Sequence, residues 1–332
     1  MAKPKVFVSQ PIPKKGIVLL EAHFDAEANA EKRVLTKKEL IARVKGKDAL
    51  LCILTDKIDA DVLSAEPKLK IVSNFGVGFN NIDVPEATKR GIVVANTPNV
   101  LNEATADCTI ALMLDIARRI SEGDRVARAG NFTGWEPEYM LGVDVYGKTL
   151  GIVGLGRIGK AVAERASKGF GMRVFYSDVI RQEDAERELG IEYKPLETLL
   201  MVSDFVSLHV PLNEKTKHMV GGHELAIMKK TACLINMARG PVVDEKALIN
   251  ALKQGTIFGA ALDVYENEPE IPKELRALQN VVLAPHLGSA TVEARDAMSV
   301  LAAQNLVDFF AGRTPRAVVN KEAVEKVARP MR

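Results

Sequence analysis

Short apolar runs rich in β-branched residues alternate with helical patterns along the whole chain, and this alternation constrains the fold more than any other feature. Within 36–46, for example, Leu40, Ile41 and Val44 recur at the spacing of one helix face. Strand–helix alternation favours parallel sheets whose faces are covered by helices, so the sequence predicts an α/β protein. The predicted strands are 5–9, 49–54, 70–75, 92–96, 149–153, 173–178, 204–210, 232–237, 259–264 and 280–285.

The 332 residues are enough for two domains of this kind. A turn-rich stretch, 130–149, separates the first set of strands from the second. Long helices are predicted at about 102–120 and 291–311. The last helix can cap the second sheet or return to the first domain, and the pattern leaves both open. We therefore expect two doubly wound parallel-sheet domains.

The composition argues against several classes of protein. Lys and Arg number 45 and Asp and Glu 43, a net charge of +2, so neither nucleic acid nor a membrane surface is expected as a partner. Cys52, Cys108 and Cys233 lie far apart in apolar runs, which predicts reduced core thiols and no disulfide framework. No group of residues has metal-ligand spacing, so no metal is expected. Without a signal-peptide pattern or an apolar run of about 20 residues, we expect a cytoplasmic chain.

The strongest local motif is a glycine-rich turn, Gly154, Gly156 and Gly159, between the strand 149–153 and a helical pattern. The first glycine permits a tight turn, the second lets the backbone approach a pyrophosphate, and the third lets helix and strand pack closely. The helix N-terminus offers free N–H groups to the anion. Asp178, at the end of the next strand, has the position of a carboxylate that binds the adenosine ribose. The turn predicts a dinucleotide site; the alternative is a structural turn that binds no phosphate.

Polar residues follow four later strands, at the edge where a doubly wound sheet binds its ligands. They are His209, Arg239, Asp263 and His286. We expect them to line one crevice that faces the cofactor. His209 ends the strand beside the adenosine side, which favours a place in the cofactor loop over an acid–base role.

Arg239, Glu268 and His286 make chemical sense together. Imidazole can give or take a proton near neutral pH, and a carboxylate on its other nitrogen favours the imidazolium. A guanidinium can bind a substrate carboxylate by a two-point fork. With a nicotinamide cofactor, this set suits the reduction of a 2-oxo acid. The alternatives are a surface salt bridge for Arg239, a solvated charge for Glu268 and a turn residue for His286.

At this point the sequence resembles a known family, the D-isomer-specific 2-hydroxyacid dehydrogenases. The resemblance implies a flavodoxin-like substrate domain of residues 1–98 plus 289–332 and a Rossmann dinucleotide-binding domain of residues 99–288. It also implies that the last helix returns to the first domain, and that two copies form a homodimer largely through the dinucleotide domains. The matching segments are 74–98, 147–163, 208–220, 234–248, 261–269 and 284–291.

The resemblance also implies roles for individual residues. Arg239, Glu268 and His286 match the catalytic residues, and Asp263 matches the Asp near the nicotinamide carboxamide. The implied substrate contacts are Leu54, Val77, Gly78, Arg239 and Trp135, with the backbone N–H groups of Val77 and Gly78 facing the carboxylate. The implied cofactor contacts are Thr105, Gly154, Gly156, Arg157, Ile158, Gly159, Asp178, His209, Pro211, Thr216, Met237, Ala238, Asp263 and Gly288.

Within the family, the stretch 130–154 is similar to the glyoxylate/hydroxypyruvate reductase branch, in which a tryptophan matched by Trp135 reaches the neighbouring subunit's active site. Asp178 should repel the extra phosphate of NADPH, which favours NAD(H) over NADP(H); Arg157 and Arg181 could offset part of that repulsion. One alternative is a D-3-phosphoglycerate dehydrogenase, although the chain ends at 332 without a regulatory domain and shows no basic cluster for a phosphate. Another is an NAD-sensing co-repressor or scaffold on the same fold. The leading prediction is an NAD(P)H-dependent reductase of small 2-oxo acids.

Overall fold

The computed structural model describes residues 2–328 and divides the chain into two units. Met1 and residues 329–332, which the expected substrate-domain range includes, lie outside the described residues. The expected boundaries were 98/99 and 288/289, and the units meet at 101/102 and 290/291. The first unit is Met1–Leu101 with Thr291–Arg332, and the second is Asn102–Ala290.

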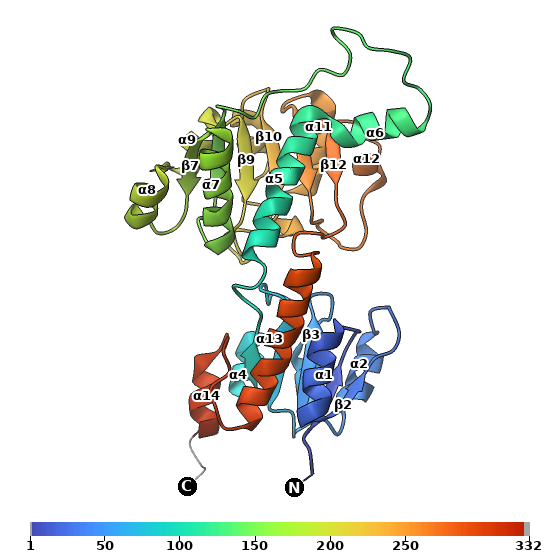
Figure 1. Ribbon diagram of the computed structural model, residues 1–332. Coiled ribbons are helices and arrows are strands. Elements are labelled where there is room, and N and C mark those ends of the chain that lie inside the picture. The colour runs from blue at the N-terminus through green and yellow to red at the C-terminus, as the bar shows by residue number, and fades with distance from the viewer. Residues whose placement is uncertain (1, 329–332) are drawn as a thin grey trace. The chain divides into compact units, whose positions relative to one another are not determined.

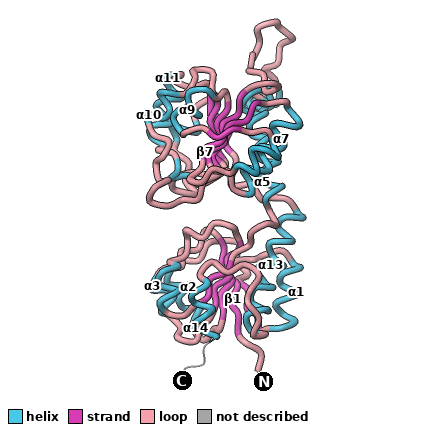
Figure 2. The backbone as a smooth tube through the Cα atoms, turned by 90° about the vertical axis from the view of Figure 1, so that its left-hand side faces the viewer, coloured by secondary structure: helices cyan, strands magenta, loops and turns pink. Residues whose placement is uncertain are grey.

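The first unit is a five-stranded parallel sheet with helices on both faces (Figures 1 and 2). Its order, β2-β1-β3-β4-β5, is the flavodoxin-like one, whose ligands bind beyond the ends of β1 and β3. Helices α1 and α13 cover one face, and α2, α3 and α14 cover the other (Figure 2). The strands are β1 Lys5–Val8, β2 Asp25–Ala28, β3 Ala49–Ile53, β4 Ile71–Phe75 and β5 Val93–Ala95. The helices are α1 Lys14–His23, α2 Lys37–Val44, α3 Ala60–Ser64, α4 Val84–Lys89, α13 Val292–Phe310 and α14 Lys321–Ala328.

Helix α13 settles the choice that the sequence pattern left open, because it packs in the first unit. Ser73, on β4, donates its hydroxyl to the carbonyl of Ala302 at 2.9 Å. On the other side, the N–H of Gly16 in α1 donates to Ser299 Oγ at 3.2 Å. The core of the first unit is therefore built from both ends of the chain.

The second unit is a seven-stranded parallel sheet in the order β12-β11-β10-β9-β6-β7-β8. Counted from β6, this is the Rossmann order with one further strand, and it reverses between β6 and β9. Helices α5 and α7 cover one face, and α9, α10 and α11 cover the other (Figure 2). The strands are β6 Thr149–Val153, β7 Arg173–Ser177, β8 Glu192–Tyr193, β9 Phe205–Leu208, β10 Cys233–Asn236, β11 Gly259–Leu262 and β12 Val281–Leu283. The helices are α5 Asn102–Arg118, α6 Ile120–Arg128, α7 Arg157–Phe170, α8 Glu183–Leu189, α9 Leu196–Val202, α10 Gly222–Ile227, α11 Glu245–Gln254 and α12 Lys273–Arg276, with a 3₁₀ turn at Gly240–Val242.

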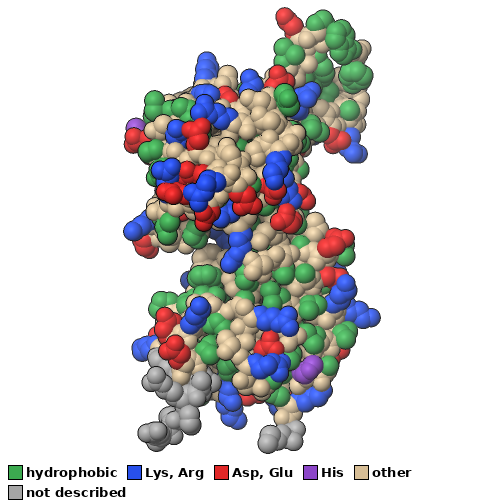
Figure 3. Space-filling model, turned by 60° about the vertical axis from the view of Figure 1, so that its left-hand side comes forward, with side chains coloured by type: hydrophobic (Ala, Val, Ile, Leu, Met, Phe, Trp, Pro, Cys, Tyr) green, Lys and Arg blue, Asp and Glu red, His purple; other side chains and the backbone are tan. Residues whose placement is uncertain are grey.

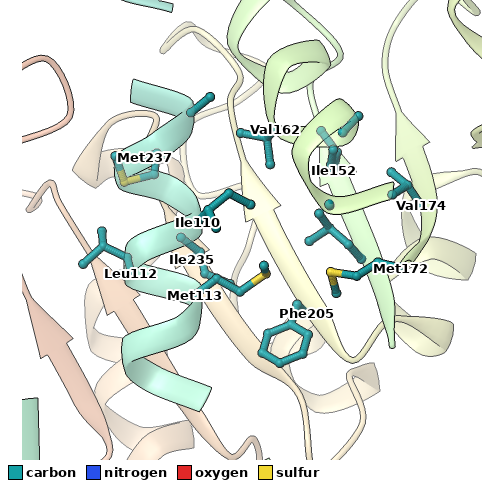
Figure 4. Packing of buried hydrophobic residues seen from close by; sticks show 14 of the residues in the cluster. Ile110, Leu112, Met113, Ile152, Val162, Met172, Val174, Phe205, Ile235 and Met237 are labelled. Atoms are coloured by element: carbon teal, nitrogen blue, oxygen red, sulfur yellow. The ribbon is translucent and has the colours of Figure 1, made fainter. Parts of the chain in front are cut away.

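The core under α5 shows why this helix forms where the sequence predicts it. Ile110 and Met113 lie three residues apart, on one face of the helix, and both are buried against the sheet (Figure 4). Ile235 and Phe205 come up from β10 and β9 to meet them. Burial of this face therefore fixes the first helix of the second unit on its sheet.

Strands β2 and β8 and helix α6 are among the elements that were not predicted. Strands β2 and β8 are edge strands with the sequences DAEA and EY, which lack the β-branched apolar runs of the inner strands. Helix α6 follows α5 after Arg119, whose left-handed backbone (φ 54°) ends the first helix and starts the second. The expected single helix 102–120 is therefore wrong in its last two residues.

Two of the three cysteines lie in the core, as predicted, and the third is only partly buried. All three are free, and Cys52 and Cys233 are buried. Burial raises the pKa of Cys233 to about 12, so its thiol stays protonated. Cys108 is half-buried, and burial raises its pKa to about 11. Across residues 2–328, no helix has the length and apolar character needed to cross a membrane.

Candidate active site

The glycine turn after β6 has the shape that a dinucleotide needs. Gly154 adopts φ +95°, and a Cβ built on it would lie 2.9 Å from the carbonyl carbon of His209. A Cβ on Gly159 would lie 2.3 Å from the oxygen of Gly154, so both positions exclude larger residues. A Cβ on Gly156 would meet no atom within 4 Å, which leaves open space at the N-terminus of α7. An anion can approach those N–H groups, so the turn fits a pyrophosphate.

Asp178 follows β7 and lies beside the same turn. Its Oδ2 accepts the N–H of Leu155 and its Oδ1 accepts that of Val179, both at 2.7 Å. Arg181 does not approach this carboxylate, because its guanidinium forks onto Glu186 at 2.9 and 2.8 Å. The structure therefore leaves a carboxylate next to the turn and pairs one of the two arginines that could offset its charge, Arg181, with Glu186. Arg157 and Ile158 form the first turn of α7.

His209 ends β9 at the point where the strand order reverses. Its Nε2 lies 2.8 Å from Ser207 Oγ, and burial lowers its pKa to about 4. The ring is therefore neutral at physiological pH, and only its backbone borders the glycine turn. Pro211 and Thr216 belong to the loop that follows, where the Thr216 hydroxyl donates to the carbonyl of Pro211 at 2.6 Å.

Gly288 lies close to three other residues that were expected to contact the cofactor. A Cβ built on Gly288 would lie 3.1 Å from Asp263 Oδ2, 3.2 Å from Met237 Cε and 3.4 Å from Thr105 Cγ2. These residues come from α5 and from the ends of β10 and β11, so only the fold brings them together. Gly288 keeps this space open at the edge of the sheet.

His286 and Glu268 form a hydrogen-bonded pair. His286 Nδ1 lies 2.9 Å from Glu268 Oε2, and Glu268 Oε1 accepts the N–H of Tyr265 at 3.0 Å. Burial raises the pKa of Glu268, but the hydrogen bond and charge of His286 outweigh burial and leave that pKa below its usual value. Glu268 is therefore an anion at neutral pH, and it orients the ring so that Nε2 is left for another partner.

Asp263 fixes the turn that carries His286. The carboxylate, which is 2% exposed, accepts the N–H groups of Leu287 and Gly288. The carbonyl of Asp263 accepts the N–H of His286 at 3.0 Å, and His286 adopts a left-handed backbone (φ 55°). Burial raises the pKa of Asp263, and its two backbone donors oppose that rise. The left-handed turn is thus held in place by one buried side chain.

Arg239 follows β10 on a turn that packs against the loop of Glu268. Its Nη1 donates to the carbonyl of Ala238 at 2.7 Å, and Asn236 Nδ2 donates to the carbonyl of Arg239 at 3.1 Å. A Cβ built on Gly240 would lie 1.8 Å from the carbonyl oxygen of Tyr265, so the two loops touch only because position 240 is glycine. Burial lowers the pKa of Arg239, while the charge of Glu268 opposes that change. Asn236 is a functional candidate that sequence reasoning missed, although it opens the same N-x-A-R-G stretch.

Leu54, Val77 and Gly78 lie in the first unit, at the ends of β3 and β4. Leu54 packs on Gly76, where an added Cβ would lie 2.5 Å from Leu54 Cδ2. The expected substrate contacts of this unit therefore share one edge of its sheet.

Trp135 lies in the loop between α6 and β6 and is 82% exposed. The same loop also exposes Phe132, Leu141 and Tyr146. Figure 3 shows apolar side chains gathered on this extension of the second unit. Large apolar side chains in one exposed patch are typical of a protein–protein contact.

Taken together, a Rossmann sheet, a glycine turn that fits a pyrophosphate and an arginine, glutamate and histidine in the same unit define a dinucleotide-dependent oxidoreductase. No group of three or more His, Cys, Asp or Glu side chains within the described part of the chain could hold a metal ion.

Comparison with known proteins identifies the family of the chain. Residues 110–288 match the family model for the D-isomer specific 2-hydroxyacid dehydrogenase, NAD binding domain. A glyoxylate reductase of Korarchaeum cryptofilum is 56% identical over 97% of this chain and 98% of its own length. One from Thermococcus kodakarensis is 52% identical over 99% of both chains. The chain therefore belongs to the D-isomer specific 2-hydroxyacid dehydrogenase family, with a nicotinamide dinucleotide as its cofactor.

Solved structures agree with this assignment. The TT0316 protein of Thermus thermophilus has a TM-score of 0.89 and 42% identity, over 95% of this chain and all of that one. An NADPH-dependent glyoxylate/hydroxypyruvate reductase of Sinorhizobium meliloti, in complex with NADP and malonate, has a TM-score of 0.85 and 34% identity, over 97% of this chain and 98% of that one. The predicted family and fold class are confirmed.

Proposed function

We propose that this chain reduces glyoxylate, hydroxypyruvate and similar small 2-oxo acids to the 2-hydroxy acids, with NADH preferred over NADPH. The observation that carries the proposal is the hydrogen bond between His286 and Glu268, in the same unit as Arg239 and the glycine turn. The names and high identity of the glyoxylate reductases support the choice of substrate. The unit that contains Val77 and Gly78 is proposed as the substrate domain.

In the proposed reaction each residue has one task. The Arg239 guanidinium holds the substrate carboxylate, and the N–H groups of Val77 and Gly78 donate to the same carboxylate. His286, protonated and paired with Glu268 through Nδ1, donates its Nε2 proton to the carbonyl oxygen as that oxygen gains negative charge. The reduced nicotinamide, when bound, supplies the hydride that reaches the carbonyl carbon. Glyoxylate gives glycolate, and hydroxypyruvate gives D-glycerate.

The preference for NADH rests on Asp178. Its carboxylate stands beside the glycine turn and would repel the 2′-phosphate of NADPH, while Arg181 is held by Glu186. We further propose that two copies associate through the second unit, with Trp135 entering the neighbouring copy's active site. The exposed apolar patch of Trp135, Phe132 and Leu141 supports this association.

A steady-state comparison of glyoxylate, hydroxypyruvate, pyruvate and 3-phosphohydroxypyruvate, each with NADH and with NADPH, tests the function. The proposal expects the highest kcat/KM for glyoxylate or hydroxypyruvate with NADH. A marked preference for 3-phosphohydroxypyruvate would instead indicate a phosphoglycerate dehydrogenase. Absence of turnover with all four acids would indicate a binding or scaffold role.

A further inference from the structure

In the turn after β4, the carbonyl oxygens of three successive residues each accept a hydrogen bond from another part of the protein. These residues are Gly76, Val77 and Gly78. The N–H of Thr97 donates to the Gly76 oxygen at 3.0 Å. Asn96 Nδ2 donates to the Val77 oxygen at 2.8 Å, and Asn74 Nδ2 donates to the Gly78 oxygen at 2.7 Å. All of these groups belong to the first unit.

A peptide group is planar and trans, so its N–H points away from its own C=O. The Val77–Gly78 peptide has its oxygen on Asn96, and the N–H of Gly78 therefore points away from that asparagine. In the same way, the bond from Thr97 to Gly76 turns the N–H of Val77 outward. Neither of these two N–H groups donates to any of the described residues.

The amide of Asn74 is itself held in place. The side chain is 0% exposed, and its Oδ1 accepts from Asn81 Nδ2 at 3.3 Å. Asn81 also donates to the carbonyls of Ile53 and Asp56, at 3.1 and 3.2 Å, on either side of Leu54. One buried network thus connects the turn of Leu54 with the turn of Val77 and Gly78.

We propose that Asn96 is a positioning residue, which holds the Gly78 N–H group in the orientation that binds the carboxylate of the 2-oxo acid, and that Asn74 supports the same turn by holding the next carbonyl, that of Gly78. This inference rests on the proposed function for the identity of the anion. The two asparagines touch no substrate atom; they act by preventing the turn from rotating its amides toward the protein. Preorganised backbone N–H groups bind an anion without a reorganisation cost at the moment of binding.

The test compares two variants of similar side-chain volume. Asn96→Leu removes the donor to Val77. Asn320→Leu is the matched control, because Asn320 lies in the same unit and bonds to Thr88, Ile92 and Val94 but not to the turn. The probe is oxamate, an unreactive analogue of a 2-oxo acid, titrated into the enzyme saturated with NADH. KM and kcat for glyoxylate and the Kd of NADH are measured alongside it.

Asn96→Leu is expected to raise the Kd of oxamate and the KM of glyoxylate roughly 10- to 100-fold, as for one lost hydrogen bond to a charged group. The kcat and the Kd of NADH should change little, because the contact exists before and during the reaction. Asn320→Leu should lower Tm and leave the Kd of oxamate and the KM of glyoxylate near their wild-type values. If Asn96→Leu does not fold, Asn96→Ala, which also removes the Nδ2 donor and adds no charge, decides in the same way, with Asn320→Ala as its control.

Unchanged oxamate affinity in the Asn96 variant overturns the inference. An equal loss of oxamate affinity in the Asn96 and Asn320 variants overturns it too, because the effect is then a general loss of packing. Suppose that the wild-type enzyme binds oxamate and that the two variants change its Kd as expected, but that no 2-oxo acid is reduced. This result refutes the proposed function and leaves the inference standing. A wild-type enzyme that reduces glyoxylate but binds no oxamate refutes the inference alone.

Discussion

His286 and Glu268 are joined through Nδ1 and Oε2 at 2.9 Å, so one nitrogen of the imidazole is committed to the protein and the other is left for chemistry. The left-handed turn that Asp263 holds presents this ring at the end of the sheet. His286, the proposed acid–base residue, therefore has a fixed orientation before any substrate arrives.

His286→Gln should lower kcat for glyoxylate reduction by about 10²- to 10⁴-fold, because the proton donor is lost while the glutamine amide still reaches Glu268. The Kd of NADH, measured by fluorescence titration, should stay near wild type. A near-normal kcat, together with a primary isotope effect from deuterated NADH that shows hydride transfer to limit the rate, would contradict the assignment.

Glu268→Gln should move the pH–rate profile. The pKa of Glu268 lies below its ordinary 4.5, so its charge is present above that pH and is lost only as the pH falls through the lowered value. Over the neutral range the carboxylate is therefore charged beside Nδ1 of His286. Without that negative charge, the alkaline limb of the kcat profile for reduction should move to lower pH. If the limb stays where it is in wild type, the two groups are not coupled.

Arg239→Lys keeps the charge and loses the planar fork. One guanidinium nitrogen donates to Ala238, so a single ammonium cannot replace both that contact and a two-point contact with a carboxylate. We expect kcat/KM for glyoxylate to fall roughly 10- to 100-fold. Arg181→Lys, in the same unit and paired with Glu186, is the control that should keep the wild-type value. Equal kcat/KM in the Arg239 variant and wild type would rule out the fork.

Asp178→Ala should weaken NADH use and improve NADPH use, narrowing or reversing the ratio of the two kcat/KM values. Removing the repulsive carboxylate matters more than adding attraction. Arg181→Ala should leave that ratio unchanged, because its guanidinium is held by Glu186. A wild-type enzyme that already prefers NADPH would disprove the role given to Asp178.

Sedimentation equilibrium should give twice the chain mass of 36.1 kDa. A double variant, Phe132→Glu with Leu141→Glu, should shift the enzyme toward monomer, since both side chains are 61% exposed in the apolar patch. Trp135→Ala should raise KM for glyoxylate in the dimer. A wild-type monomer at micromolar concentration would remove the basis for a role of Trp135 in a neighbouring copy.

The inner strands and the glycine turn could be predicted because their signals are local. Gly154, Gly156 and Gly159 lie within six residues, and Asp178 follows one strand later. Strands β2 and β8 could not be predicted, since an edge strand needs no apolar alternation when a neighbour supplies its hydrogen bonds. The backbone of Arg119, which divides α5 from α6, likewise has no marker such as glycine or proline.

The candidate site could be predicted only in part. Spacing placed Arg239 and His286 after strands, chemical reasoning grouped Glu268 with them, and the resemblance supplied the roles of all three. Asn74 and Asn96 carried no such signal, because their partners Gly78 and Val77 are backbone carbonyls whose direction only the folded turn defines. The neutral state of His209 also depends on burial, which strand spacing does not report.

Hydrogen bonds join β4 and α1 to α13, so the first unit cannot complete its fold until α13 has been synthesised. Synthesis runs from the N-terminus, and domains fold as units while the chain emerges. All of Asn102–Ala290 is synthesised before α13, so the second unit can begin to fold while α1 is the only one of the two helices on that face of the first sheet. A ribosome that stalls after residue 290 would thus release a chain with a finished dinucleotide domain and part of an apolar sheet face open to chaperones and proteases.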